Sequence, residues 1–375
     1  MVSNKQFLDS LREHGVDFFC GVPDSLLKNF CAYLGSCTDN SEHIITANEG
    51  AAVGLAAGYH ISTGKLPLVY LQNSGLGNTV NPLLSLADPE VYSIPMILMI
   101  GWRGEPGVAD EPQHSKQGRI QNAMLDAMEV PYFILNSETD DVPDFVSNVT
   151  ERARELSGPV AIVVKKNTFE EFSSVEGDES EYELSREEAI HHILDSLSEK
   201  EIVVSTTGKP SREVYEYRVA KGQGHQNDFL TVGSMGHTSQ IALGIALNTD
   251  RKVICLDGDG SLIMHMGSLS INGSNAPENF KHVVLNNGAH DSVGGQPTIG
   301  FEISIPEIAN GCGYKDVYTA SDASELENLL DDFLKSAGPS LLEVRIKKGA
   351  RSDLGRPEST PVQNKMELMK FLNSE

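Results

Sequence analysis

The sequence has few cysteines, no long apolar run and a shortage of positive charge. The cysteines are odd in number and form no C-x-x-C pair, which argues against a zinc site and fits a reducing compartment. The apolar stretch at residues 94–100 is far too short to cross a bilayer, and residues 1–15 contain no apolar run of the signal-peptide type. We therefore expect a cytoplasmic protein with no membrane partner. The five cysteines are Cys20, Cys31, Cys37, Cys255 and Cys312.

Positive charge is scarce, because 29 Lys and Arg residues stand against 53 Asp and Glu residues and give a net charge of −24. An excess of negative charge repels polyanions, which argues against nucleic acid as a partner. If the substrate is itself an anion, a few cations must gather locally against the field of the whole protein.

A polar, acidic segment divides the chain. The residues between Asn167 and Arg186 are rich in Glu, Asp, Ser and Gly, as is typical of a solvated linker. Directly after it, Ser185 and Glu188 have the spacing of a helix capping box. With 375 residues there is room for two or three domains. We predict a first domain at residues 1–175, a linker at 176–184 and a second domain at 185–375.

Each half alternates short apolar, β-branched runs with helical patterns, which predicts an α/β fold with two doubly wound parallel sheets. The halves also resemble each other: a small-residue helix, a strand and a glycine turn recur in the same order. This arrangement is common among α/β proteins, but we predict one fold used twice. The strands are expected at residues 16–22, 43–47, 66–73, 95–101, 158–165, 201–208, 229–234, 252–258, 282–287 and 341–346.

Two polar motifs fall at the ends of successive strands of the second half. Gly258-Asp259-Gly260-Ser261 ends one strand, and Asn286-Asn287 ends the next. Open α/β sheets bind ligands at this edge, and Mg²⁺ prefers oxygen ligands shared with phosphates. The glycines let the backbone come close to a ligand, while Ser261 and the following helix N-terminus offer hydrogen-bond donors to a diphosphate. A lone G-D-G is more often a turn, so it is the pairing that predicts a metal and phosphate site.

The spacing G-D-G-S, 24 residues, N-N resembles the binding signature of the thiamine diphosphate enzymes. The resemblance implies thiamine diphosphate and Mg²⁺ as cofactors, with the metal held by Asp259, Asn287 and the Ala289 carbonyl. It also implies that the family's usual tyrosine-like wall residue is replaced here by His290. The same family match assigns cofactor binding to Thr207, Gly208, Gly233, Met235, Gly258, Gly260 and Ser261.

The resemblance extends to the first half. Glu49 opens an Ala- and Gly-rich helix, where the family has the carboxylate that activates the cofactor's aminopyrimidine; a plain helix-dipole role is the alternative. Because Glu49 and Asp259 lie in different halves, and the family binds its cofactor between subunits, at least a homodimer is implied.

Three segments narrow the resemblance to the phosphonopyruvate decarboxylase family, whose nearest relatives are the sulfopyruvate decarboxylases. These are G-V-P-D-S at 21–25, residues 101–119, and S-T-T-G-K-P-S-R-E at 205–213. No middle domain is expected between the two cofactor domains. The implied reaction decarboxylates the anionic 2-oxo acid 3-phosphonopyruvate, with sulfopyruvate as the alternative substrate. A carboligase and a catalytically inactive relative remain weaker alternatives.

Candidate substrate residues follow from the same segments. Arg103, His114, Lys116 and Arg119 would form the local cation cluster that an anionic substrate requires, and arginine suits a phosphonate best; a solvated basic loop is the alternative. Asp24 matches a polar residue that handles protons in related decarboxylases, although Asp24 or Ser25 could equally cap the next helix. Catalytic roles are thus predicted for Glu49, Asp24 and His114, and substrate contacts for Asp24, Ser25, Arg103, His114, Lys116, Arg119 and His290.

Overall fold

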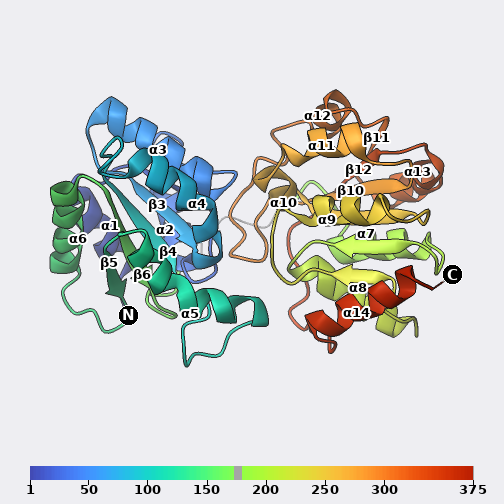
Figure 1. Cartoon of the computed structure of the whole chain (residues 1–375), viewed down its shortest axis with the longest axis horizontal. Helices are drawn as coiled ribbons and strands as arrows, with labels where there is room; N and C mark the ends of the chain where they lie inside the picture. The colour runs from blue at the N-terminus through green and yellow to red at the C-terminus, as the bar shows by residue number, and fades with distance from the viewer. Residues whose placement is uncertain (173–179, 375) are drawn as a thin grey trace. The chain divides into compact units, whose positions relative to one another are not determined.

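The computed structural model describes residues 1–172 and 180–374, which form two compact units, Met1–Glu176 and Gly177–Glu375 (Figure 1). The linker predicted at 176–184 falls partly on residues 173–179, which lie outside the described residues; residues 180–184 carry no helix or strand. Within the described part of the chain, no helix combines the length and apolar character that crossing a membrane requires.

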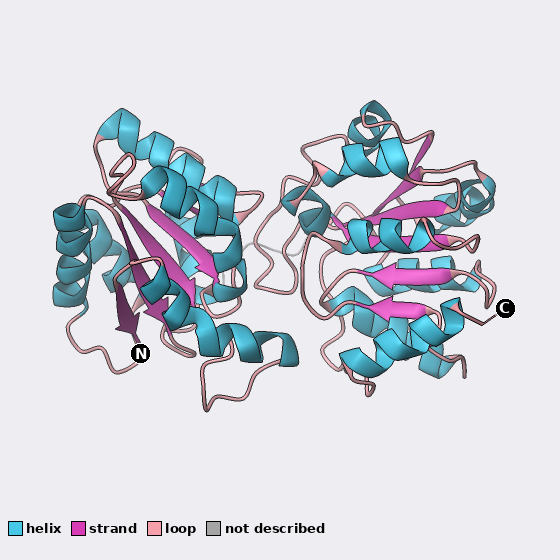
Figure 2. Ribbon diagram, viewed as in Figure 1, coloured by secondary structure: helices cyan, strands magenta, loops and turns pink. Residues whose placement is uncertain are grey.

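The first unit is built on a six-stranded, all-parallel sheet covered by helices on both faces (Figure 2). Its strands are β1 Phe19–Gly21, β2 His43–Ile45, β3 Leu68–Gln72, β4 Met96–Gly101, β5 Tyr132–Leu135 and β6 Pro159–Val164. Its helices are α1 Asn4–Glu13, α2 Lys28–Cys37, α3 Glu49–Thr63, η1 Asn73–Gly75, α4 Leu76–Pro82, η2 Leu83–Ala87, α5 Pro112–Ala127 and α6 Val142–Leu156. Alternate residues of β3 enter two cores, because Leu68 and Tyr70 pack with α1, α2 and α6 while Val69 and Leu71 pack with α3, α4 and α5.

The second unit repeats this construction. Its strands are β7 Ile202–Ser205, β8 Asp228–Leu230, β9 Val253–Gly258, β10 Phe280–Asn286, β11 Asp316–Ala320 and β12 Ser340–Arg345. Its helices are α7 Arg186–Asp195, α8 Lys209–Ala220, α9 Thr238–Ala246, α10 Asp259–Met264, α11 Ser268–Asn275, α12 Ile305–Gly311, α13 Ala323–Lys335 and α14 Pro361–Leu372. On β9, Ile254 and Leu256 pack with α7, α8 and α13, whereas Val253 and Cys255 pack with α9, α10 and α12.

The two units share one strand order. The first sheet runs β2-β1-β3-β4-β6-β5, and the second, read from its other edge, runs β8-β7-β9-β10-β12-β11. Numbered within its own unit, each sheet therefore has the order 2-1-3-4-6-5. The predicted fold class, α/β with two doubly wound parallel sheets, is confirmed, and so is the prediction that one fold is used twice.

All ten predicted strands are present, but two strands were missed. These are β5 and β11, which occupy the same edge position in the two sheets and have mostly part-exposed side chains. The sequence of β11, D-V-Y-T-A, is interrupted by polar residues, whereas β5, Y-F-I-L, is a short apolar run that the sequence reading overlooked.

The strand order fixes where ligands are expected to bind. In each unit the chain leaves the first strand toward one edge and returns to build the rest of the sheet on the other side. This reversal lies between β1 and β3 in the first unit and between β7 and β9 in the second. Ligands of open α/β sheets bind beyond the carboxyl ends of strands at such a reversal.

Candidate functional site

The predicted metal ligands of the second unit lie at the ends of two adjacent strands. Leu285 pairs with Gly258 across β9 and β10, so Asp259 and Asn287 follow at neighbouring strand ends. Asp259 is 2% exposed; its carboxylate accepts hydrogen bonds from the Thr298 hydroxyl and the Asn287 backbone N–H. Burial nevertheless raises the pKa of Asp259 to about 6. A bound cation would supply the charge that this buried carboxylate lacks.

The surroundings of Asp259 fit a small, hard cation. The Asn287 Oδ1 accepts a hydrogen bond from the Ala289 N–H at 3.1 Å. This bond holds Ala289, whose carbonyl is the third predicted metal ligand, close to the end of β10. Gly300 keeps a space open, because a Cβ there would lie 2.8 Å from Asp259 Oδ2. Gln296 is 8% exposed, and neither polar atom of its side-chain amide has a hydrogen-bond partner among the described residues. An all-oxygen donor set suits Mg²⁺.

Residues predicted to bind the diphosphate meet at the reversal between β7 and β9. Ser261 Oγ accepts hydrogen bonds from the Thr206 hydroxyl at 3.2 Å and from the Gly236 N–H at 3.1 Å. Thr207 follows Thr206, and Gly208, with φ of +97°, forms the turn that begins α8. The ends of β7 and β9 and the turn before α9 therefore converge where helix N-termini offer backbone donors.

Met235, Gly260 and His290 lie together in the same unit. A Cβ on Gly260 would lie 3.0 Å from the His290 ring and 3.4 Å from Met235 Cε. Gly233 begins the turn that carries Met235, and Ser234 between them has φ of +56°, a strained value for a residue other than glycine. Burial lowers the pKa of His290 to about 4, so its imidazole is neutral at neutral pH.

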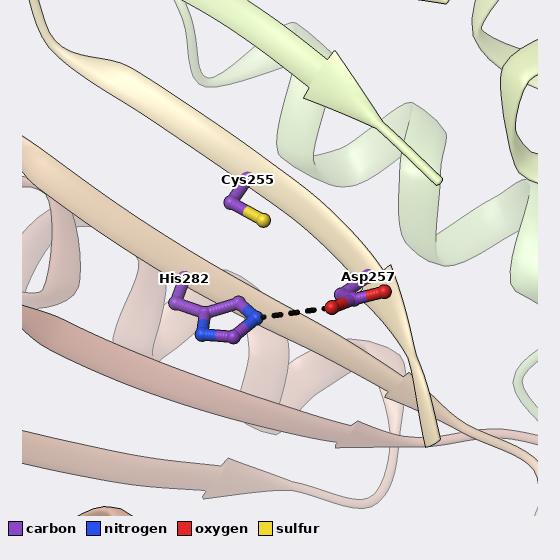
Figure 3. A group of neighbouring side chains, drawn as sticks. All are labelled: Cys255, Asp257 and His282. Carbon is purple, nitrogen blue, oxygen red and sulfur yellow. Dashed lines mark ion pairs between the residues drawn. The ribbon is translucent and has the colours of Figure 1, made fainter. Parts of the chain in front are cut away.

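A second polar group lies inside this unit (Figure 3). Cys255, Asp257 and His282 are buried on β9 and β10, and their ligand atoms lie within 4.8 Å of one another. Such a group could hold a metal ion if His282 Nε2 and the Cys255 sulfur both lost their protons. Burial raises the pKa of the Cys255 thiol well above its usual value, which disfavours the thiolate that a metal requires.

The hydrogen bonds around His282 instead form a directed chain. Gln240 donates to Asn272 Oδ1 at 2.7 Å, and Asn272 Nδ2 donates to the Tyr314 hydroxyl at 3.2 Å. Tyr314 in turn lies 2.9 Å from His282 Nδ1, and its own proton is left to donate there. The His282 proton is then on Nε2, which lies 3.5 Å from Asp257 Oδ2. A metal bound at this nitrogen would need its lone pair, so the proton excludes it. This arrangement favours a hydrogen-bonded chain over a metal centre.

Replacing Tyr314 with Phe tests that reading. The variant leaves the Asn272 N–H and His282 Nδ1 without a partner, so we expect the free energy of unfolding to fall by about 1–3 kcal/mol in urea titrations. Adding Zn²⁺ to the unmodified protein should not raise its melting temperature. A rise that disappears in Cys255→Ala would instead establish a metal site.

In the first unit, Glu49 is a buried carboxylate. It opens α3 after the cap residue Asn48, is 4% exposed, and accepts a hydrogen bond from Asn78 Nδ2 at 2.7 Å. A Cβ at Gly75 would overlap its carboxylate. A glutamate that served only the helix dipole would extend into solvent, so this enclosure favours the predicted binding role.

Asp24 lies at the reversal between β1 and β3 and is fully buried. Gln72 Nε2 donates to its Oδ1 at 2.6 Å, and the Leu26 N–H donates to its Oδ2 at 3.0 Å. Burial raises the pKa of Asp24 in spite of these bonds and of the Arg103 charge. The bond to Leu26 closes a local turn, but α2 begins at Lys28 with Leu27 as its cap residue and without a side-chain cap hydrogen bond, so the alternative that Asp24 or Ser25 caps this helix is wrong.

Arg103 is held from two sides. Its Nη1 donates to Ser25 Oγ at 2.6 Å and its Nε to Asp110 Oδ2 at 2.8 Å. Burial opposes ionisation of Asp110, but hydrogen bonds from Arg103 and two backbone N–H groups hold its pKa well below the usual range. His114 is 8% exposed, and burial, followed by the Arg103 charge, lowers its pKa. Its Nδ1 has no hydrogen-bond partner among the described residues.

Two predicted cations stand apart from this group. Lys116 and Arg119 are exposed on α5, and no hydrogen bond or ion pair between described residues links them to Arg103. The structure therefore brings together Asp24, Ser25, Arg103 and His114, but not all four predicted cations.

Sequence reasoning missed the segment at residues 72–75, which supports three predicted residues at once. Gln72 bonds Asp24, the Asn73 amide donates to the Arg103 carbonyl at 2.7 Å, and Gly75 faces Glu49. The similarity between the halves was the signal that could have found it. This turn follows β3, which has the position in its sheet that β9, followed by G-D-G-S, has in the other.

Gly75→Ala tests the packing of Glu49. The added methyl would overlap the carboxylate, so we expect a large loss of turnover with little change in overall helix content. Gly77→Ala is the matched control, because Gly77 lies two residues on, in α4, and a Cβ there meets nothing within 4 Å. The control should be neutral or stabilising by up to about 1 kcal/mol. Equal activity of the two variants, compared at matched melting temperature, would contradict the assigned packing.

Two family matches show the class of this protein, the thiamine pyrophosphate (thiamine diphosphate) enzymes. The family "Thiamine pyrophosphate enzyme, N-terminal TPP binding domain" matches residues 1–130, and "Thiamine pyrophosphate enzyme, C-terminal TPP binding domain" matches residues 206–344. Between these two matches, the described residues contain no third domain. The prediction of a two-domain enzyme of this class is confirmed.

Full-length relatives narrow the class. Phosphonopyruvate decarboxylase of Streptomyces viridochromogenes is 34% identical over 97% of this chain and 93% of its own length. Phosphonopyruvate decarboxylase of Streptomyces hygroscopicus is 33% identical over 96% of this chain and 92% of its own length. Sulfopyruvate decarboxylase of Methanosarcina acetivorans is 28% identical over 92% of this chain and 91% of its own length. The chain belongs to the phosphonopyruvate decarboxylase family of thiamine pyrophosphate-dependent decarboxylases, as its motifs predicted.

Proposed function

We propose that the protein decarboxylates 3-phosphonopyruvate to phosphonoacetaldehyde and carbon dioxide, a step of phosphonate biosynthesis, using thiamine diphosphate and Mg²⁺. The observation that carries the proposal is the similarity, along nearly the whole chain, to two phosphonopyruvate decarboxylases. The Arg103 site supports it with a fixed guanidinium beside a buried, unsatisfied imidazole.

The second unit would hold the cofactor's charged end. Asp259, Asn287 and the Ala289 carbonyl are the proposed Mg²⁺ ligands, and Ser261 with the turn at 207–208 would bind the diphosphate. When bound, thiamine diphosphate supplies the carbanion and the electron sink that decarboxylation requires. The glycines at 258 and 260 would allow close approach, Met235 would support the middle of the cofactor, and the Gly233 carbonyl would accept a hydrogen bond from the aminopyrimidine amino group.

The first unit would hold the aminopyrimidine through Glu49. Its carboxyl is enclosed and anchored by Asn78, so it is oriented before a ligand binds. A carboxyl fixed in this way can hold a proton at a ring nitrogen without reorganisation. Because the family binds its cofactor between subunits, we also propose at least a homodimer.

Arg103 is suited to the substrate's phosphonate. A guanidinium has five N–H groups, of which Asp110 and Ser25 use three. The remaining two, one on Nη1 and one on Nη2, could donate to phosphonate oxygens. The pKa of His114 is lowered, so we assign it a hydrogen bond rather than a charge. Asp24 would hold the turn that carries Ser25 and keep a protonatable carboxyl behind it.

The substrate is tested by assaying purified protein with thiamine diphosphate and Mg²⁺ against both acids. We expect phosphonoacetaldehyde from phosphonopyruvate, measured by coupled reduction of the aldehyde, with kcat/KM above that for sulfopyruvate. Good turnover of sulfopyruvate alone would reject the proposed substrate and leave the enzyme class intact.

Arg103→Lys tests the anion site. Lysine keeps the positive charge but cannot bond Asp110 and the substrate in the same fixed geometry. We therefore expect KM for phosphonopyruvate to rise about 10- to 100-fold, which corresponds to the loss of one charge-assisted hydrogen bond. Arg119→Lys on exposed α5 is the control and should change KM by less than about twofold. Equal effects of both substitutions would argue for a diffuse basic surface instead.

A further inference from the structure

Arg186 is a buried cation outside the residues considered so far. It is the first residue of α7 and is 5% exposed. Its Nε and Nη2 donate to the two carboxylate oxygens of Glu213 on α8, at 2.8 and 3.0 Å. Its Nη1 donates to Asp291 Oδ2 at 2.9 Å. One guanidinium thus joins two helices to the loop at residues 287–298.

This loop carries the proposed metal ligands. Asp291 directly follows His290 and lies two residues beyond Ala289, and its carboxylate also accepts a hydrogen bond from the Gly349 N–H at 3.1 Å. The loop has little regular structure beyond an isolated bridge between Ala289 and Pro297. Backbone hydrogen bonds within the loop, such as that from the His290 N–H to the Gln296 carbonyl at 2.8 Å, shape it locally, and contacts with the helices fix its position in the unit.

The same loop packs on the proposed diphosphate turn. A Cβ on Gly208 would lie 2.8 Å from Ser292 Oγ, so the residue after Asp291 lies against the turn that begins α8. Glu213 lies on that same helix. Arg186 therefore binds the helix through Glu213 and the loop through Asp291, which fixes the loop against the turn.

Charge balance alone does not explain Asp291. Glu213, which is 1% exposed, already neutralises Arg186 through two parallel hydrogen bonds. A second carboxylate adds a negative charge that the pair does not need, so its contribution is the link to the loop.

We propose that Asp291 is a positioning residue, whose ion pair with Arg186 holds the loop bearing Asn287, Ala289 and His290 in the geometry that binds Mg²⁺ and the diphosphate. This inference rests on the proposed assignment of the cofactor to these residues. It adds that the affinity for the cofactor is set in part by a buried pair that touches neither the metal nor the diphosphate.

Asp291→Asn is the test, because asparagine retains the shape and an acceptor for Gly349 but loses the ion pair. The dissociation constant of thiamine diphosphate at saturating Mg²⁺, measured by titration calorimetry, should rise about 10- to 100-fold, as for other groups that orient metal ligands. Asp291→Glu restores the charge and should recover part of that affinity. The partial rescue keeps the test usable if the Asn variant folds poorly.

Asp228→Asn is the matched control. Asp228, the first residue of β8, is fully buried and accepts two hydrogen bonds, at 3.2 and 3.1 Å, from Arg218 on α8, the helix that also carries Glu213. Among the described residues, no hydrogen bond or ion pair links Asp228 to the loop at 287–298. The control should lower the melting temperature at least as much and leave the dissociation constant within about twofold, since distant sites act independently. If Asp291→Asn lowers only the melting temperature, or both variants weaken binding alike, the positioning role is rejected. If the unmodified protein binds no thiamine diphosphate, the cofactor assignment itself fails.

Discussion

Each predicted catalytic or metal-binding carboxylate depends on a glycine that leaves space for it. Glu49 lies against Gly75, Asp24 against Gly101, and Asp259 against Gly300, and in each case a single added Cβ would overlap or crowd the carboxylate. Burying a carboxylate is costly unless donors are aimed at it, and the donors here are Asn78 on α4, Gln72 at the end of β3 and Thr298 in the loop after β10. The glycines therefore allow charged groups to be enclosed and oriented without a bound ligand.

The repeated fold gives the two units equivalent positions but different chemistry. The turns after β3 and β9 occupy the same place in their sheets. In the second unit this turn presents Asp259 and Ser261 directly, whereas in the first it presents amides and a glycine that support Asp24, Arg103 and Glu49. The frame is thus shared, and the choice of side chains at the strand ends separates the proposed metal and diphosphate site from the proposed substrate site.

The sequence predicted what depends on local patterns and missed what depends on distant contacts. Ten of the strands follow from apolar runs, and the G-D-G-S and N-N motifs from their position at strand ends. The roles of Gln72 and Gly75 could not be read locally, because each acts on a residue more than twenty positions away. The pairing of Arg103 with Asp110 could not be predicted either. The two residues are only seven positions apart, but this spacing does not indicate that the Asp110 carboxylate occupies one edge of the Arg103 guanidinium.

That pairing changes the argument about charge. A protein with a net charge of −24 was expected to attract an anion through a cluster of cations. The group that the structure brings together instead contains one guanidinium already bonded to a carboxylate, beside a histidine whose pKa is lowered. Because Asp110 already pairs with Arg103, a dianion gains less from the field at this group than it would from a cluster of unpaired cations. At the proposed substrate site, discrimination between a phosphonate and a sulfonate would then depend on the remaining N–H groups of Arg103, whose guanidinium is oriented by Asp110 and Ser25.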